Sequence, residues 1–208
     1  MEWANILGGI IAALVAAIGI PLALRKRRKE SSQNVAQLLH HLQEIGVKAS
    51  LLEKGAEEEK VGVSRASGQR SEGIIKIESR NINYINVISV SSQYGVNYFL
   101  DYLVTSPSWP GKKNKKKTKM VRKKSSGIWG RVVDIEWKGD DYLSRQLNLD
   151  YRLKDRLLQI VLEGLKGDIW IFPEQKYEYA RVRTSYLLPP YELFEAIEII
   201  TGHIKSGW

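Results

Sequence analysis

The residues best suited to chemistry in this sequence are nine cations in one short run, GKKNKKKTKMVRKK at residues 111–124. The run holds eight lysines, one arginine and no acidic residue. Cations at this density bind phosphate groups, either on nucleic acid through counterion release or on anionic lipid head groups. Trp109 lies just before the run, between two prolines, where its ring is suited to a lipid interface or to stacking on a base. The predicted binding residues are Trp109, Lys112, Lys113, Lys115, Lys116, Lys117, Lys119, Arg122, Lys123 and Lys124.

The other polar residues form no recognised catalytic or metal-binding pattern. The sequence lacks a phosphate loop, a dinucleotide-binding glycine motif, HExxH and GxSxG. His40, His41 and Glu44 give an H-x-x-E spacing, but a di-iron site needs such motifs on two helices, so a polar helix face is the better interpretation. The absence of cysteine excludes disulfides and thiolate metal sites. We expect no cofactor and no metal, and an enzyme of unrecognised chemistry is only an alternative.

The net charge of +9 arises from two clusters and not from the whole chain. The sequence has 32 basic and 23 acidic residues, and the nine cations of the run equal the net charge. A second cluster, RKRRK, follows an apolar N-terminal segment and consists of Arg25, Lys26, Arg27, Arg28 and Lys29. Outside these clusters acidic residues outnumber basic ones, so the basic character is confined to two patches.

The N-terminal segment predicts a single transmembrane helix. Residues 3–24 carry no charge and as a helix would extend about 33 Å, which matches a hydrocarbon core of about 30 Å. A cleaved signal peptide is the alternative, but it needs cations before a shorter apolar core, whereas here they follow it. Because Lys and Arg stay on the cytoplasmic side, RKRRK predicts a cell-membrane protein with its N-terminus outside and its C-terminal domain in the cytoplasm.

Small residues recur every four positions within this span, in two adjacent rows. Such a smooth face lets two helices approach closely in lipid, so it favours a homodimer; a passive anchor is the alternative. The residues of the two rows are Gly8, Gly9, Ala12, Ala13, Ala16 and Ala17.

The segments that must position the cationic run predict an α+β domain. Helical spacing of apolar residues predicts a short helix over residues 31–46, one or two helices over 139–167 and a closing helix over 189–205. Asp140 or Asp141 is the predicted cap of the middle helix, with Asp150 as a second cap. Strand patterns predict a mostly antiparallel sheet flanked by two to four helices. The predicted strands are 47–52, 60–66, 73–79, 82–91, 96–104, 128–138, 168–172 and 176–186.

The sequence therefore predicts three regions: an anchor at 1–24, a basic juxtamembrane segment at 25–30, and a cytoplasmic α+β domain at 31–208. The cationic run belongs to a predicted basic loop at 105–127, inserted between two strands. Trp129, Trp137 and Trp170 fall on strands and are expected in the core.

The expected function is that of a membrane-anchored interaction or scaffold domain whose basic loop contacts anionic lipid. An anchored loop meets a lipid surface at little additional cost in association entropy. A membrane-tethered nucleic-acid-binding domain is the alternative. It is less favoured because the sequence offers no aromatic residues interleaved with cations on a sheet. A solvated loop without a specific partner is the simplest alternative.

Overall fold

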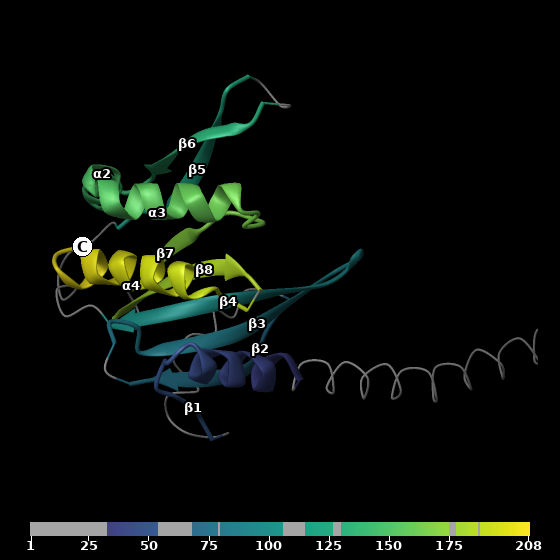
Figure 1. Ribbon diagram of the computed structural model, residues 1–208. Coiled ribbons are helices and arrows are strands. Elements are labelled where there is room, and N and C mark those ends of the chain that lie inside the picture. The colour runs from purple at the N-terminus through teal and green to yellow at the C-terminus, as the bar shows by residue number, and fades with distance from the viewer. Residues whose placement is uncertain are drawn as a thin grey trace, which may run out of the picture.

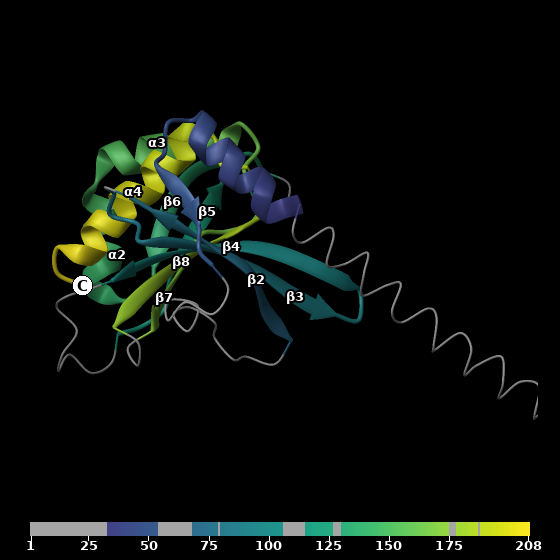
Figure 2. The ribbon, with the colours of Figure 1, turned by 90° about the horizontal axis from the view of Figure 1, so that it is seen from below.

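The protein is an α+β domain in which one antiparallel sheet carries helices on a single face (Figures 1 and 2). The computed structural model describes residues 33–53, 68–78, 80–105, 115–126, 130–174, 178–186 and 188–208. Within these ranges the sheet has eight strands in the order β1-β2-β3-β4-β8-β7-β5-β6. Every pairing is antiparallel. The last hairpin in the chain, β7 and β8, thus lies between β4 and β5.

The strands vary from three to eleven residues. More and less buried residues alternate along much of β5 and β6, as in a sheet with one face on the core, whereas β3, β4 and β8 contain continuous buried runs. Their bounds are β1 Ala49–Leu51, β2 Gln69–Ile77, β3 Tyr84–Ser92, β4 Gly95–Thr105, β5 Thr118–Lys124, β6 Val132–Lys138, β7 Trp170–Glu174 and β8 Tyr179–Ser185.

Within the described ranges, four helices cover one face of the sheet (Figure 2). The first occupies residues 33–44, and the others are α2 Asp141–Leu149, α3 Tyr151–Leu162 and α4 Tyr191–Lys205. The Asp140 carboxylate accepts the Leu143 N–H and caps α2, and the Asp150 carboxylate accepts the Leu153 N–H and caps α3. These bonds satisfy donors that a helix start otherwise leaves open, which explains why the chain breaks into two helices at Asp150.

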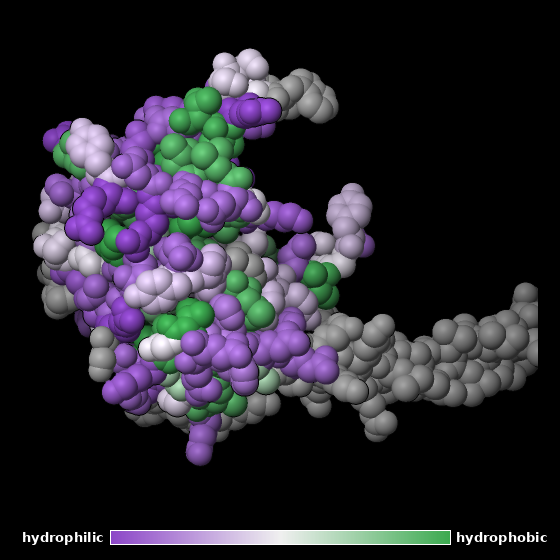
Figure 3. Space-filling model, viewed as in Figure 1, coloured by the Kyte–Doolittle hydropathy of each residue, from purple (hydrophilic) through white to green (hydrophobic). Residues whose placement is uncertain are grey.

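The main core lies between the sheet and the helices. Leu38 and Leu42 of the first helix, and Leu193 and Ile197 of α4, are fully buried. They join one cluster with Tyr102 of β4 and the alternate inward residues of the other strands. Figure 3 shows the outer side of the helices as mostly hydrophilic with separate hydrophobic patches, the ordinary pattern of a solvent-facing surface.

The edge strand β6 is closed by a side chain. Asn148 of α2 donates to the Trp137 carbonyl at 2.9 Å and accepts the Trp137 N–H at 2.8 Å. The Asn148 amide thus satisfies both backbone groups of Trp137, which limits pairing with another strand at this edge.

The predicted fold class needs correction in one part. The α+β class and the antiparallel sheet are confirmed, but none of the helices in the described ranges is long and apolar enough to cross a membrane. The predicted transmembrane helix is therefore removed from the fold class. Residues 3–24, to which it was assigned, lie outside the described residues, as do the small-residue rows, the RKRRK cluster and the predicted strand at 60–66.

The predicted basic loop at 105–127 also differs from the structure. Residues 118–124 form β5, which pairs with β6 over most of its length and with β7 at its start. Repulsion along the lysine run favours a loop only if the strand has no partners, and here two neighbouring strands supply them. Residues 106–114 lie outside the described residues.

Candidate functional site

Strand geometry divides the cationic run between the two faces of the sheet. Thr118 and Met120 of β5 are fully buried toward the helices, so Lys117 and Lys119 project from the opposite face, where both are exposed. Arg122 shares the parity of Met120 and donates through Nη2 to the carbonyls of Leu165, at 2.9 Å, and Gly167. Arg122 therefore ties β5 to the segment after α3 and is not available to a ligand on the other face.

The remaining cations of the run have separate environments. The Lys115 ammonium lies 5.7 Å from the ring centres of both Tyr142 and Trp208. The Lys116 backbone N–H donates to the Asp140 carboxylate at 3.2 Å. The Lys123 ammonium forms ion pairs with Asp134 at 3.8 Å and Glu136 at 3.4 Å, and Lys124 is exposed at the end of β5. Trp109, Lys112 and Lys113 lie outside the described residues.

The face of the sheet that points away from the helices, here called the distal face, carries a row of polar and aromatic side chains. Strand register places one residue of each strand directly beside the next. From β6 to β3 the row is Lys138, Lys119, Trp170, Arg183, Asp101 and Asn86. The parallel row beside it contains Phe172, Arg181, Leu103 and Tyr84.

The exposed part of the distal face lies over β5, β6 and β7. Lys119 and Lys138 are exposed, and Trp170 and Phe172 are partly exposed. Toward β2 and β3 the distal face is buried: Ile74 is 3% exposed and Ile88 is 1% exposed. A ligand of the distal face would therefore meet the β5–β6–β7 side first.

Two exposed lysines and two buried arginines lie close to the aromatic rings of this region. The Lys117 ammonium lies 3.7 Å from the ring centre of Trp170 and 4.7 Å from that of Phe172, and the Lys119 ammonium lies 5.2 Å from Trp170. The guanidinium carbons of Arg181 and Arg183 lie 4.8 and 5.6 Å from Phe172. These distances fall within the range of cation–π attraction. The cation–aromatic site consists of Lys117, Lys119, Trp170, Phe172, Arg181 and Arg183.

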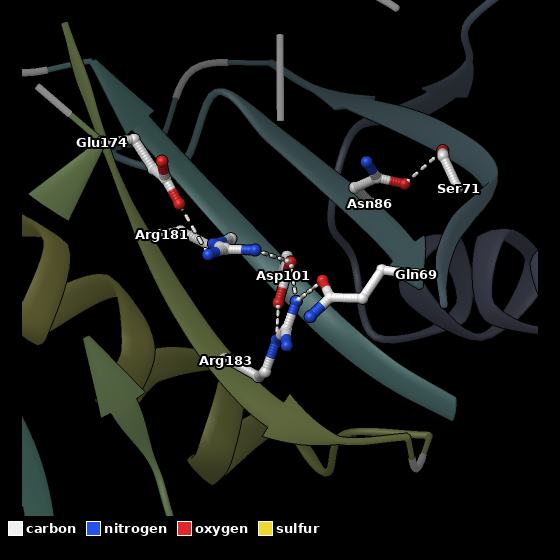
Figure 4. A network of polar contacts seen from close by, with 7 residues as sticks. All are labelled: Gln69, Ser71, Asn86, Asp101, Glu174, Arg181 and Arg183. Carbon is white, nitrogen blue, oxygen red and sulfur yellow. Dashed lines mark hydrogen bonds and ion pairs between the residues drawn. The ribbon is translucent and has the colours of Figure 1, made fainter. Parts of the chain in front are cut away.

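A buried carboxylate fixes the two arginines (Figure 4). Asp101 is fully buried, and its carboxylate accepts a bidentate pair of hydrogen bonds from Arg183, from Nε at 2.6 Å and from Nη2 at 2.7 Å. Arg181 donates to Asp101 at 3.2 Å and to Glu174 at 2.6 Å, and Gln69 accepts from Arg183 at 3.3 Å. Bidentate pairing with a carboxylate holds a guanidinium group in a fixed plane. Both arginines are thus held rigidly against the sheet.

The two lysines of the site differ from the arginines because no carboxylate of the described residues lies within ion-pair distance of them. Partial burial lowers the pKa of Lys117, and the neighbouring charges of Lys119, Arg183 and Arg181 lower the same pKa further. The second effect means that the ammonium group lies in a positive local potential. An anion placed beside Lys117 would reduce this repulsion.

Two cavities elsewhere in the described residues do not have the character of an active site. One, about 390 Å³ in volume, lies between Gln43, Lys48 and Glu78. The other, about 350 Å³, lies between Glu163, Lys166 and Tyr186. Neither combines a Ser, Cys or His with a carboxylate in the way nucleophilic catalysis requires. Across the same ranges no three His, Cys, Asp or Glu side chains gather as metal ligands.

Sequence reasoning missed most of the cation–aromatic site. Lys117 and Lys119 were among the predicted residues, but Trp170 was expected in the core, and Phe172, Arg181 and Arg183 were not singled out. In DIWIF every residue from Ile169 to Phe172 is apolar, so the pattern hides which face each ring takes. The alternation in ARVRTS, with arginines at 181 and 183 on either side of Val182, was the available signal, although both arginines are buried.

No known relative bears on the interpretation of this site. Comparison of the chain with protein-family models, with curated proteins and with solved structures finds no match.

Proposed function

We propose that the protein binds nucleic acid through the cation–aromatic site on the distal face of its sheet. The observation that carries the proposal is the position of the exposed Lys117 and Lys119 beside the partly exposed ring of Trp170. The neighbouring ring of Phe172 is also partly exposed and lies against the buried Arg181 and Arg183. Cations that track a phosphate backbone, combined with aromatic rings that accept bases, are the two parts of many nucleic-acid-binding sheets. The sequence alone suggested no such interleaving.

Charge arithmetic within the site favours a polyanion. Two carboxylates, Asp101 and Glu174, face the two arginines, so the arginines are close to neutralised locally. Lys117 and Lys119 add two positive charges with no such partner among the described residues. Each phosphate contacted by a lysine releases condensed counterions, which is the main source of affinity in such complexes.

The position of the rings argues for nucleic acid over a lipid surface. Trp170 and Phe172 are partly buried within the sheet and have cations on either side, so they cannot reach far into a bilayer. A base lies flat on a ring and needs no such projection.

Contact with an anionic lipid surface is a second candidate, and it has an observation of its own. The β5–β6 hairpin extends beyond the helices (Figure 1), and Lys123, Lys124 and Arg131 are exposed near its end. Each Lys or Arg near an anionic surface contributes about 1 kcal/mol. However, Lys123 is already paired with Asp134 and Glu136, which weakens this candidate.

The test is binding of the full chain to a fluorescent oligonucleotide, followed by anisotropy at several salt concentrations. Lys117→Gln/Lys119→Gln should weaken binding and reduce the slope of log affinity against log salt by about 1.4, because each lost phosphate contact on a single strand contributes about 0.7. Lys48→Gln/Lys166→Gln removes the same charge from exposed positions outside the site and should leave the slope unchanged.

Vesicles with and without anionic lipid form a parallel arm of the experiment. Preferential binding to anionic vesicles, insensitive to Lys117→Gln/Lys119→Gln, would favour the hairpin and the lipid candidate. Equal losses of oligonucleotide affinity in the two double variants would show that net charge alone matters, which would overturn the proposed site.

A further inference from the structure

We infer that the ligand of the cation–aromatic site is a single strand, with two neighbouring bases stacked on Trp170 and Phe172. The inference rests on the proposed function and names its substrate class. A site that reads only charge would bind duplex and single strand alike, because both present phosphates. Rings that stack on bases select single strands, since the faces of paired bases are covered by their neighbours in a duplex.

The geometry of the two rings suits this role. Trp170 and Phe172 lie two residues apart on β7 and therefore project from the same face of the sheet. Their ring centres are 6.3 Å apart, and the ring planes are inclined by only 25°. The two rings form a stacked pair, and bases of a single strand can extend this stack. Stacking is tolerant of sequence because every base has a π-face.

Charged side chains of the neighbouring strands pack against the two rings. In the strand register Trp170 lies between Lys119 and Arg183, and Phe172 lies beside Arg181. Asp101 fixes both arginines, so Phe172 packs against side chains that cannot easily move. The exposed Lys119 beside Trp170 is well placed to meet a phosphate of the strand, whereas the buried arginines support the ring of Phe172.

Lys117 occupies the place of a base in the free protein. Its ammonium lies 3.7 Å from the ring centre of Trp170, yet Lys117 is exposed and lacks a carboxylate partner among the described residues. Like charges around it make this position electrostatically unfavourable for a cation. When a base stacks on Trp170, the flexible lysine side chain can turn toward the adjoining phosphate. Lys117 thus covers the ring until a strand arrives.

The experiment compares a labelled oligothymidylate with a mixed-sequence duplex of equal length, both titrated with the full chain at one salt concentration. The wild-type protein should bind the single strand at least about tenfold more tightly. Trp170→Leu keeps an apolar side chain but removes the π-face, so it should reduce single-strand affinity by about tenfold and leave duplex affinity unchanged. Trp170→Phe should restore most of the loss.

Tyr94→Ala removes an aromatic ring that is 91% exposed in the β3–β4 turn, and it should have no effect on either ligand. Equal affinity of the wild-type protein for both ligands, together with no effect of Trp170→Leu, would overturn the stacking inference while leaving the proposed function in place. Failure to bind either ligand at low salt would overturn both. Circular dichroism of each variant identifies any loss of folding.

Discussion

At the scale of single residues, the decisive group is Asp101, because it is the buried negative charge on which two arginines converge. Asp101 is fully buried and contacts Arg183 twice and Arg181 once. A buried ion pair adds little net stability over an apolar pair, but removal of one partner leaves the other charge buried and unpaired. Asp101 is therefore a positioning residue for the cation–aromatic site.

Asp101→Ala should lower the free energy of unfolding by about 3–5 kcal/mol, because it leaves Arg181 and Arg183 without their shared carboxylate. Asp101→Asn keeps the shape and one acceptor and should cost less. Urea denaturation measures both, with Asp155→Ala, an exposed position on α3, as the control. A loss below about 1 kcal/mol for Asp101→Ala would show that the network is not required for the fold.

Glu198 is a second buried carboxylate, on the helix side of the sheet, and its titration should make stability depend on pH. Its carboxylate, only 8% exposed, accepts the N–H groups of Asn81 and Ile82 at 2.9 and 3.3 Å and so attaches α4 to the segment before β3. Burial raises the pKa of Glu198, although the two backbone hydrogen bonds act in the opposite direction.

Because the folded pKa of Glu198 is raised, the native state binds this proton more strongly than the unfolded state does. The free energy of unfolding should therefore fall as pH rises above the ordinary carboxyl pKa of 4.5 and through the folded pKa. The pKa values of Asp134 and Asp150 are lowered, so their contributions to stability are already complete throughout the pH range in which Glu198 titrates. Glu198→Gln should flatten the decline above about pH 5 in denaturation curves. An unchanged pH profile would exclude Glu198 as its source.

At the scale of elements, strand alternation explains both what could be predicted and what could not. The helices were accessible from the sequence because caps such as Asp140 and Asp150 mark their starts. The strand β5 was not, because its lysines repel one another and only pairing with β6 and β7 keeps it extended. The apolar run from Ile169 to Phe172 at the start of β7 likewise conceals its exposed face, which is why Trp170 was assigned to the core. The site thus depends on long-range pairing that no local pattern records.

A close approach of backbone segments positions Lys117. Gly139, in the turn between β6 and α2, has a φ of +141°, and a Cβ there would overlap the Lys117 carbonyl oxygen. Gly139→Ala should lower the free energy of unfolding by about 3 kcal/mol or more, since steric overlap adds to backbone strain.

Gly164 provides the matched control for this prediction. It has a φ of +113°, but no atom lies within 4 Å of the position that a Cβ would take, so Gly164→Ala reports backbone strain alone. That strain should cost about 1–3 kcal/mol. Thermal or urea denaturation compares the two variants. Similar losses would mean that the contact with Lys117 contributes nothing, contrary to the expected difference.

At the scale of the whole molecule, one face of the sheet packs against the helices, and the other face carries the proposed binding site. The helices and the inward residues form the main core, whereas the distal face carries cations, aromatic rings and a buried acid. The net charge of +9 draws the chain toward polyanions at long range, and this effect weakens with salt. The sequence analysis placed the predicted contact in a loop, whereas Lys119 of the proposed site lies on β5 and Lys117 directly precedes that strand.

The most direct measurement is photo-crosslinking of the full chain to a single-stranded oligonucleotide that carries bromouracil, with the linked peptides identified by mass spectrometry. If the strand lies on the cation–aromatic site, crosslinks should occur in β7, at Trp170 or Phe172, and should disappear in Trp170→Leu/Phe172→Leu. Crosslinks confined to the RKRRK cluster at residues 25–29, or to the helix-covered side, would contradict the central claim.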